Sequence, residues 1–492
     1  MSEQRSTRPK ARVPRGFRDR GAAEIAAERA CLDTIRRVFE SWGFEALETP
    51  SFEYTDALGK FLPDLDRPNE GVFSLLDEDN QWLSLRYDLT APLARYVAEN
   101  FQHLPKPFRR YQVGSVWRNE KPGPGRYREF TQFDADTVGS ASPAADAELL
   151  MMARDALLAV GLARDEFVIR FNSRKLLDGV LEASGLALDE TSESRSRRGV
   201  VLRAIDKLDR LGIAGVRALL GAGRKDESGD FTRGAGLGND QIKRIESFIA
   251  LAQGGSGELD DTRPLVAGSA SGEEGLTELE AIERILGHDN GISFDPGIVR
   301  GLDYYTGAVF EAQLTFPVTN EAGEEIVFGS VVGGGRYDDL VARFTGECVP
   351  ATGISIGVSR LLTALRRRRT AALPPLVLVL ALDKEDRARS FALAAELRAA
   401  DLRVETYIGE AGMKAQLKYA DRRGAAVAVI EGSDERAKGE VTIKDLVMGA
   451  ELAKSVESRA AWVEGRPAQI SVPRTELVAR VRALLDRSAR SS

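Results

Sequence analysis

Residues 108–139 combine the side chains of a nucleotide site in two alternating stretches joined by a loop. Arg118 and Glu120 close the first stretch, and Arg126 and Phe130 open the second. Paired guanidinium N–H groups bind phosphate, a carboxylate accepts from an adenine amino group, and an aromatic ring stacks on a base. We therefore interpret the segment as a binding surface for a phosphorylated base. An exposed hairpin with a charged face is the alternative interpretation.

The alternation in residues 108–139 predicts a long β-hairpin, because side chains two positions apart lie on one face of a strand. In the second arm, Phe130, Gln132, Asp134 and Asp136 share one parity. One face of the hairpin is therefore expected to present a ring, an amide and two carboxylates together.

Asp88 and Thr90 stand where a short strand, residues 82–85, leads into a helix that runs through Ala98. A carboxylate and a hydroxyl at such a junction bind an ammonium group. The same residue types cap helix N-termini, and Pro92 suits the first turn of a helix. Ammonium binding and helix capping are therefore two interpretations of this pair.

Two further segments combine flexible backbone with reactive or charged neighbours. Residues 300–307, Arg-Gly-Leu-Asp-Tyr-Tyr-Thr-Gly, place an arginine, a carboxylate and two phenols ahead of a strand at 308–315. Gly333, Gly334 and Gly335 let the backbone approach a ligand or a neighbouring strand closely.

Arg360 follows a buried strand within residues 353–357 and begins the next helix. The N-terminus of a helix carries partial positive charge, so an arginine there opposes the helix dipole. We therefore expect Arg360 to bind an anion.

Helices and strands of ordinary length must position these side chains. Residues 22–42 carry an apolar stripe at helical spacing, and Gly43 suits the end of that helix. Residues 44–54 predict a strand that Pro50 restricts to an edge or an interface. The next segments predict, in order, a helix, a strand and a small helical insertion with mobile glycine-rich loops: residues 144–160, 166–172 and 186–275.

Beyond a basic and proline-rich linker at residues 366–375, the pattern becomes β-α-β-α-β. This alternation predicts a separate α/β domain with a mainly parallel sheet. We therefore divide the chain into residues 1–370, which include the insertion at 186–275, and a second domain at residues 376–492.

Composition limits the classes of protein that remain. A chain of 492 residues with 43% hydrophobic and 29% charged side chains is typical of a soluble globular protein. Such a length suggests roughly three ordinary domains. No apolar run approaches about 18 residues, and the N-terminus lacks the apolar segment of a secretory signal. The net charge of −7 means that a nucleic acid must be held by local basic patches.

Cys31 and Cys348 are too few for a metal-ligand cluster or a disulfide framework. This usage favours a reducing compartment, and therefore a cytoplasmic protein. His103 and His288 have no nucleophile motif near them. Neither a metal site built from histidine and cysteine nor a histidine-based triad is therefore expected.

Several segments occur in the order found in histidyl-tRNA synthetases, which the chain resembles over nearly its whole length. They are Pro-Arg-Gly-Phe-Arg-Asp at 14–19, the helix and strand ending at Pro50, the hairpin at 108–139, the run at 300–307, the segment at 353–362 and Leu-Lys-Tyr-Ala-Asp-Arg-Arg-Gly at 417–424. The run at 300–307 is specific to this family among class II synthetases. The resemblance implies an α+β fold: a class II antiparallel sheet core with flanking helices and a helical insertion, followed by a C-terminal α/β anticodon-binding domain.

The resemblance also implies roles for residues already singled out by their chemistry. Arg118 and Arg300 would contact the α-phosphate of ATP and the carboxylate of histidine, and are the implied catalytic residues. The implied ATP-binding residues are Arg118, Glu120, Arg126, Phe130 and Arg360. The implied histidine-binding residues are Asp88, Thr90, Arg118, Gln132, Asp136, Arg300, Tyr304 and Tyr305. The tRNA acceptor end would meet Lys121 and Gly123.

The family's reaction joins L-histidine to the 3′ end of tRNA(His). Histidine and ATP, with Mg²⁺, give histidyl-adenylate and pyrophosphate, and the histidyl group then passes to the tRNA. The resemblance further implies a cytoplasmic homodimer without a membrane partner. Pro50 beside a long amphipathic helix agrees with a dimer interface.

Two features depart from the pattern of many bacterial relatives. Asp88 and Asp136 stand where those relatives have Glu, so each carboxylate is one methylene shorter. The loop at 121–125 is Lys-Pro-Gly-Pro-Gly, where many resemble Arg-Pro-Gln-Lys-Gly. We therefore hypothesise that this chain reads the acceptor end, including the additional 5′ guanosine of most histidine tRNAs, differently.

Two other classes of protein share part of this pattern. A catalytically silent paralogue that regulates ATP phosphoribosyltransferase usually lacks the anticodon domain and degrades the run at 300–307. An RNA-binding sensor would keep the C-terminal domain without all of Arg118, Arg300 and Arg360. The chain has all of these features, so the sequence favours the synthetase.

Overall fold

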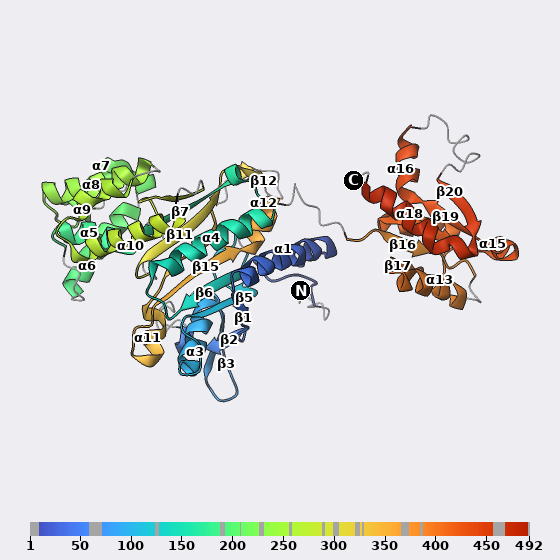
Figure 1. Cartoon of the computed structure of the whole chain (residues 1–492), viewed down its shortest axis with the longest axis horizontal. Helices are drawn as coiled ribbons and strands as arrows, with labels where there is room; N and C mark the ends of the chain where they lie inside the picture. Colours follow the sequence, from blue (N-terminus) through green and yellow to red (C-terminus); the bar gives the residue numbers. More distant parts are fainter. Residues whose placement is uncertain are drawn as a thin grey trace, which may run out of the picture. The chain divides into compact units, whose positions relative to one another are not determined.

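The chain forms two compact units, residues 1–370 and 371–492, each with its own sheet and core (Figure 1). The structure is a computed structural model. It describes residues 9–58, 71–123, 127–186, 192–206, 208–225, 231–254, 258–287, 291–298, 305–319, 325–326, 329–365, 373–383, 387–455 and 468–490.

The first unit is built on an eight-stranded sheet with the order β1-β5-β6-β15-β14-β11-β7-β10. Its strands are β1 (Glu45–Ala46), β5 (Phe108–Trp117), β6 (Glu129–Val138), β7 (Phe167–Ser173), β10 (Ile292–Phe294), β11 (Ala308–Leu314), β14 (Ser330–Arg336) and β15 (Ala351–Gly357). The central strands pair antiparallel, and the short edge strands β1 and β10 pair parallel with their neighbours. The antiparallel core implied by the resemblance is therefore confirmed.

The predicted hairpin is confirmed as β5 and β6, which pair antiparallel along residues 108–117 and 129–138. The free edge of β6 pairs with β15, so the hairpin lies inside the large sheet. Most of β6 is buried. The alternative of an exposed hairpin with a charged face is therefore wrong.

One face of the sheet is covered by α1 (Ala22–Ser41), α4 (Pro143–Ala159) and α12 (Val358–Leu365), which share its apolar core. Helices α1 and α4 cross the strands in Figure 1. The ring of Phe39 in α1 meets Phe133 of β6 edge to face, with ring centroids 5.0 Å apart. The predicted helix at 22–42 is confirmed, and Gly43 follows it with a φ of 81° that suits glycine. The predicted helix at 144–160 is confirmed as α4.

A smaller core lies where β6 ends and β15 begins. There α3 (Thr90–Asn100) and α11 (Asp339–Thr345) pack against Val138 and Ala351. Because Val138 and Asp136 share a face of β6, these two helices flank the polar face of the strand. They therefore form one wall of the region in which the candidate site residues lie.

Residues 44–54 do not form the single strand that was predicted. β1 ends at Ala46, and β2 (Phe52–Tyr54) belongs to a separate sheet with β3 (Ser74–Leu76) and β4 (Trp82–Leu85), beside the short helix α2 (Thr55–Leu58). Pro50 lies between β1 and β2, and its missing N–H cannot join a strand ladder. The prediction for residues 82–85 is confirmed by β4.

The insertion is mainly helical, as predicted, and appears green in Figure 1. Its helices are α5 (Arg174–Ala183), α6 (Ser192–Asp206), α7 (Leu208–Leu220), α8 (Asn239–Gly254), α9 (Leu259–Val266) and α10 (Ala270–Leu286). One glycine-rich segment also contains two paired strands, β8 (Gly223–Lys225) and β9 (Phe231–Arg233), which the loop prediction missed. The other short elements of this unit are η1 (Arg164–Glu166), β12 (Val318–Thr319) and β13 (Glu325–Ile326).

The second unit has a five-stranded sheet with the order β17-β16-β18-β19-β20. Its elements are β16 (Leu376–Val379), α13 (Arg387–Ala399), β17 (Arg403–Thr406), α14 (Met413–Arg422), β18 (Ala425–Ile430), α15 (Ser433–Lys438), β19 (Glu440–Asp445), α16 (Leu446–Ser455), β20 (Gln469–Pro473), η2 (Arg474–Glu476) and α18 (Leu477–Arg490). The predicted β-α-β-α-β order is confirmed. β17, β16 and β18 pair parallel, whereas β19 and β20 add antiparallel strands that the prediction of a mainly parallel sheet did not anticipate.

Candidate active site

Alternation along β6 separates a packed face from a polar face. Phe133 and Ala135 enter the core shared with α1 and α4. Gln132, Asp134 and Asp136 are one residue out of phase and therefore lie on the opposite face. The predicted grouping of an amide and two carboxylates on one face is confirmed by this geometry.

β15 continues the polar face to the next strand. Its two isoleucines are buried in the apolar core, so the glycines and the serine between them face the other way. The facing pairs are Gly353 with Asp136, Ser355 with Asp134 and Gly357 with Gln132. The small residues of β15 therefore leave room beside the polar side chains of β6.

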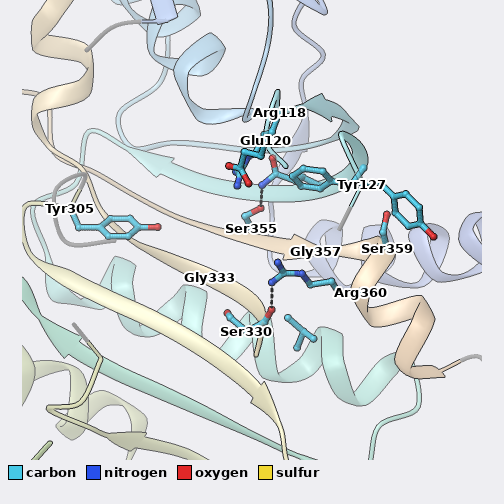
Figure 2. Close-up of a pocket in the computed structure, with 13 residues that line it drawn as sticks. Arg118, Glu120, Tyr127, Tyr305, Ser330, Gly333, Ser355, Gly357, Ser359 and Arg360 are labelled. Carbon is cyan, nitrogen blue, oxygen red and sulfur yellow. Dashed lines mark hydrogen bonds between the residues drawn. The ribbon is translucent and has the colours of Figure 1, made fainter. Parts of the chain in front are cut away.

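A cavity of 310 Å³ opens at this polar face (Figure 2). That volume falls in the range of small-molecule sites. The predicted site residues in its lining are Arg118, Glu120, Phe130, Gln132, Tyr305 and Arg360. Tyr127, Ser330, Ser355 and Ser359 also line it, and the sequence had not singled them out as site residues. Segments far apart in the chain thus meet at one cavity.

Arg118 and Phe130 lie together on the facing arms of the hairpin. The guanidinium carbon of Arg118 is 5.2 Å from the centre of the Phe130 ring, an attractive cation–π distance. Arg118 Nε also donates to the backbone oxygen of Tyr87 at 3.2 Å. A guanidinium group is therefore held beside an aromatic ring at the cavity.

Arg360 reaches across the cavity from α12. That helix begins at Val358, two residues before the predicted start at Arg360, so Arg360 lies in its first turn. Arg360 Nη1 donates to the backbone oxygen of Ser330 at 3.0 Å (Figure 2). The guanidinium therefore lies between the N-terminus of α12 and β14. An anion there would be stabilised by the guanidinium and by the helix N-terminus.

The glycine run of β14 serves two purposes. A Cβ at Gly334 would lie 2.3 Å from the carbonyl oxygen of Gly353, and a Cβ at Gly335 would lie 2.5 Å from that of Ala308. The predicted close approach to neighbouring strands is therefore confirmed. Gly333 instead lines the cavity, where the absence of a side chain leaves space for a ligand.

Asp88 caps α3, which confirms one of its two interpretations. Its Oδ1 accepts from the backbone N–H groups of Thr90 at 3.1 Å and Ala91 at 2.9 Å. Burial raises the pKa of Asp88, while the N–H of Ala91 and the charge of Arg118 act in the opposite direction. The described lining of the cavity includes neither Asp88 nor Thr90.

Arg110 and Asp136 form a buried ion pair under the polar face. Arg110 Nη2 lies 2.9 Å from Asp136 Oδ2 and donates to the backbone oxygen of Leu89 at 2.9 Å. The hydroxyl of Tyr337 donates to Asp136 Oδ1. Burial raises the pKa of Asp136, and Arg110 and Tyr337 oppose that rise. Asp136 Oδ1 is therefore hydrogen-bonded and Oδ2 belongs to an ion pair, and Asp136 is not part of the described cavity lining.

Asp134 lies on the same polar face of β6, and like Asp136 it is not part of the described cavity lining. Its side chain is 1% exposed. Burial, and next the charge of Asp136, raise the pKa of Asp134 to about 8, while Arg110 and a hydrogen bond from Ser355 oppose the rise. Gln132 Nε2 donates to Ser355 Oγ at 2.6 Å, so these three side chains form one network.

Tyr305 directs its phenol into the cavity (Figure 2). Burial raises the pKa of Tyr305, and the charges of Asp134, Asp88 and Asp136 add to the effect in that order. The phenol therefore remains a neutral hydrogen-bonding group at ordinary pH. Three predicted site residues, Arg126, Arg300 and Tyr304, lie outside the described residues.

Lys121 and Gly123 lie in the loop that joins β5 to β6, and both are exposed. The described lining of the cavity does not include them. They follow Glu120, which does line the cavity, along the chain.

Comparison with known families divides the chain at the same linker as its two compact units. The histidyl-tRNA synthetase family matches residues 16–361, and an anticodon-binding domain matches residues 376–484. The first match contains every strand of the large sheet, and the second contains the five-stranded sheet.

Individual relatives agree with these matches. The chain is 56% identical to a histidine–tRNA ligase of Rhizobium meliloti, over 99% of this chain and 98% of that protein. It is 54% identical to a histidine–tRNA ligase of Caulobacter vibrioides, over 98% and 99% of the two chains. A histidyl-tRNA synthetase crystal structure from a Nostoc species covers 97% of this chain and all of its own, with 30% identity and a TM-score of 0.69. The chain therefore belongs to the histidyl-tRNA synthetase family.

Proposed function

We propose that this chain is a histidine–tRNA ligase, an ATP-dependent enzyme that joins L-histidine to the 3′ end of tRNA(His). The observation that carries the proposal is the meeting of Arg118, Phe130, Gln132, Tyr305 and Arg360 at one cavity in a member of this family. These side chains supply groups for phosphate, for a base and for a polar ring. The relative from Rhizobium meliloti is itself a histidine–tRNA ligase.

ATP is proposed to bind with its base on Phe130 and its amino group at Glu120. Arg118 would reach the α-phosphate, and Arg126 and Arg360 would hold the outer phosphates. The cation–π contact of Arg118 with Phe130 supports this placement of ATP, because it holds a guanidinium next to the ring on which the base would stack. Arg360 lies in the first turn of α12, and this position supports its assignment to the outer phosphates.

Histidine is proposed to lie between the ATP and the floor of the cavity. The groups assigned to it are Arg118 and Arg300 for its carboxylate, Asp88 and Thr90 for its ammonium, and Gln132, Asp136, Tyr304 and Tyr305 around its ring. Gln132 and Tyr305 line the cavity, which supports a ring at this end. Asp88 uses one oxygen to cap α3, so ammonium binding would use the other.

The first chemical step is in-line attack of the histidine carboxylate on the α-phosphorus. Histidyl-adenylate forms and pyrophosphate leaves. The adenylate then loses AMP as the terminal ribose hydroxyl of the tRNA attacks its carbonyl. No protein nucleophile is needed: Arg118 and Arg300 hold two anions in line and stabilise charge that grows on the phosphoryl oxygens. We assign these two arginines as the catalytic residues.

Magnesium is proposed to enter with ATP. Mg²⁺ is often held by substrate phosphates with one or two carboxylates and several waters, rather than by a protein cage. No cluster of three metal-binding side chains occurs among the residues that the structure describes, and Glu120 is a single carboxylate in the cavity lining. Such a lining fits a metal that belongs to the nucleotide, and the ion would neutralise phosphate charge there.

The tRNA is proposed to contact both units. The second unit would bind the anticodon, and its basic residues on or near α14 are Lys414, Lys418, Arg422 and Arg423. Arg423 already pairs with Glu405, so the lysines are better candidates for RNA contact. Lys121 and Gly123 in the hairpin loop would meet the acceptor end. The Lys-Pro-Gly-Pro-Gly sequence of that loop supports a different reading of the 5′ guanosine.

We also propose a cytoplasmic homodimer. Neither Cys31 nor Cys348 forms a disulfide, which agrees with a reducing compartment. None of the described helices is long and apolar enough to cross a membrane. The exposed apolar face of the small β2-β4-β3 sheet supports the dimer.

The regulatory paralogue is the second candidate class. Such proteins usually lack the anticodon-binding domain, whereas residues 376–484 match one. The run at 300–307, which they degrade, is complete in this sequence. Both features favour the enzyme.

Histidine-dependent exchange of labelled pyrophosphate into ATP tests the proposal with the purified chain. Activity should require histidine, and Arg300→Ala should reduce it by about 10²- to 10³-fold or more, as loss of a transition-state donor does. Thermal unfolding of the variant should match the unaltered protein. Absence of exchange from the unaltered chain would refute ligase activity, and full exchange in Arg300→Ala would refute the role of that arginine.

A further inference from the structure

The segment Pro-Arg-Gly-Phe-Arg-Asp at residues 14–19 has no role in the proposed function. It contains a tight turn in which the N–H of Phe17 donates to the backbone oxygen of Pro14 at 3.1 Å. Gly16 lies in this turn with a φ of 85°, a conformation that favours glycine. The backbone oxygen of Gly16 accepts from the N–H of Arg128 at 2.8 Å. The N-terminal segment therefore lies beside the second arm of the hairpin, next to its loop.

Arg128 connects this segment to residues that line the cavity. Its Nε donates to the backbone oxygen of Glu120 at 3.0 Å, and its backbone oxygen accepts from the N–H of Arg118 at 2.9 Å. Its guanidinium carbon is 5.9 Å from the centre of the Phe73 ring, and the ring of Phe17 lies 5.9 Å from that same ring. Arg118 and Glu120 both line the cavity. Arg128 therefore links the N-terminal segment to one wall of the candidate site.

Gly16 makes this contact possible because it has no side chain. A Cβ at this position would lie 2.8 Å from Arg128 Cγ, 2.9 Å from Arg128 Cδ and 3.3 Å from Pro122 Cβ. Carbon atoms in ordinary contact are about 3.5–4.0 Å apart. Arg128 cannot move aside freely, because hydrogen bonds hold both its backbone N–H and its Nε. A side chain at residue 16 would therefore displace Arg128 and, through it, Glu120.

Arg18 makes a second contact with the hairpin. Its guanidinium carbon lies 4.5 Å from the centre of the Tyr127 ring, and the same guanidinium pairs with Glu24 of α1. A second cavity of 330 Å³ has Arg18 in its lining and shares Tyr127, Phe130 and Ser359 with the first cavity. Because the two rings border both cavities, packing alone holds them less firmly than it would in a dense core. The contact with Arg18 therefore helps to fix the position of Tyr127.

We propose that residues 14–18 position the ATP end of the cavity, with Gly16 and Arg18 as positioning residues. This inference rests on the proposed function and makes it more specific. The contacts that carry it reach Glu120 and Tyr127 in the hairpin. The histidine ring is instead assigned to residues farther along β6 and ahead of β11. A change in the N-terminal segment should therefore affect ATP more than histidine.

Histidine-dependent pyrophosphate exchange by Gly16→Ala tests the inference on the full chain. The KM for ATP should rise by at least about 10-fold, because a small displacement of a binding group can cost up to about 100-fold. The KM for histidine should stay within about twofold. Gly43→Ala is the matched control, since Gly43 has a φ of 81° and a Cβ there would meet no atom within 4 Å. Both variants carry similar backbone strain, so only Gly16→Ala should change the KM for ATP.

Two further measurements support the comparison. Arg18→Lys keeps a positive charge for Glu24 but loses the flat guanidinium over Tyr127, so it should raise the KM for ATP by about three- to tenfold. Hydrogen–deuterium exchange reports on the segment without any activity. The backbone N–H of Arg128 should exchange at least about 10-fold faster in Gly16→Ala than in Gly43→Ala, because its hydrogen bond to residue 16 is disturbed.

The outcomes distinguish this inference from the proposed function. A KM for ATP that is equal in Gly16→Ala and Gly43→Ala, or an equal rise in the KM for histidine, would overturn the positioning role while ligase activity stands. If Gly16→Ala does not fold, as judged by thermal unfolding, Arg18→Lys replaces it, and an unchanged KM for ATP would overturn the role. No histidine-dependent exchange by the unaltered chain would remove the proposed function itself, and deuterium exchange at Arg128 would still test the contact with Gly16.

Discussion

Gly353 is a single residue on which the geometry of the site depends. A Cβ at this position would lie 2.0 Å from Asp136 Oδ1 and 2.8 Å from its Cγ. Asp136 cannot move away freely, because Arg110 and Tyr337 hold both of its oxygens. Gly353→Ala should therefore destabilise the first unit by about 1–3 kcal/mol, as overpacking of a core does. Histidine-dependent exchange should fall on the order of 100-fold through misplacement of the polar face.

The matched control for Gly353→Ala is Gly21→Ala. A Cβ at Gly21 would meet no atom within 4 Å, and its φ of −84° is ordinary for alanine. Chemical denaturation should place this control within about 0.5 kcal/mol of the unaltered protein, as is usual for surface substitutions. Equal stability of the two variants would contradict the close packing of Gly353 against Asp136.

Residue parity predicted part of the site and missed part of it. Parity placed Gln132, Asp134 and Asp136 on one face of β6, and the family resemblance assigned Gln132 and Asp136 to the ligand, but parity alone cannot show which carboxylate is already paired. The partners of Asp136, Arg110 and Tyr337, come from other strands, and their contacts appear only in three dimensions. Ser355 was missed for the same reason, since a serine between isoleucines carries little chemical signal until its neighbours are known.

At the scale of elements, predictions succeeded where periodicity was strong and local. The hairpin of β5 and β6 and the buried strand β18 follow from alternation or from a short apolar run with clear ends. The prediction of one strand at residues 44–54 was wrong because these residues divide between two sheets. The partner strands of each half lie far away in the sequence. Strands β8 and β9 were not predicted, because three-residue strands in a glycine-rich segment have almost no periodicity to detect.

The pairing of Asp146 with Arg336 joins α4 to the end of β14. Both side chains are buried, at 2% and 4% exposure, and Arg336 also donates to the backbone oxygen of Ser140 at 2.9 Å. Asp146→Asn should therefore lower the free energy of unfolding by about 3–5 kcal/mol, because it removes the nearer and more buried of the two carboxylates that pair with Arg336. Urea denaturation followed by circular dichroism measures this change.

An exposed ion pair provides the control for Asp146→Asn. Asp260 and Arg263 pair on α9, with side chains 81% and 57% exposed. Asp260→Asn should cost less than about 1 kcal/mol, because solvent already screens the pair. Similar losses of unfolding free energy in Asp146→Asn and Asp260→Asn would show that burial does not set the strength of the contact between α4 and β14.

At the scale of the whole molecule, two units follow one another in the order of the family. Residues 16–361 match the synthetase and residues 376–484 match the anticodon-binding domain. Each unit has its own apolar core, so each can supply a separate part of tRNA binding. The chain therefore carries both recognition and chemistry, which is the organisation that a regulatory paralogue lacking the second domain would not have.

The β2-β4-β3 sheet offers an apolar face that a second copy of the chain would cover. Phe52 and Tyr54 of β2 and Leu75 of β3 are 44%, 56% and 46% exposed, and the pairing through Leu83 puts Tyr54 and Leu75 on one face. Exposed apolar patches of this kind commonly mark protein interfaces. Light scattering on the unaltered chain should therefore give the mass of two chains, and Tyr54→Asp combined with Leu75→Lys should shift it toward one. Phe231→Lys, an equally exposed apolar position in β9, should leave the mass unchanged. The mass of one chain before any substitution would contradict the dimer, and a dimer that survives the double change would place its interface elsewhere.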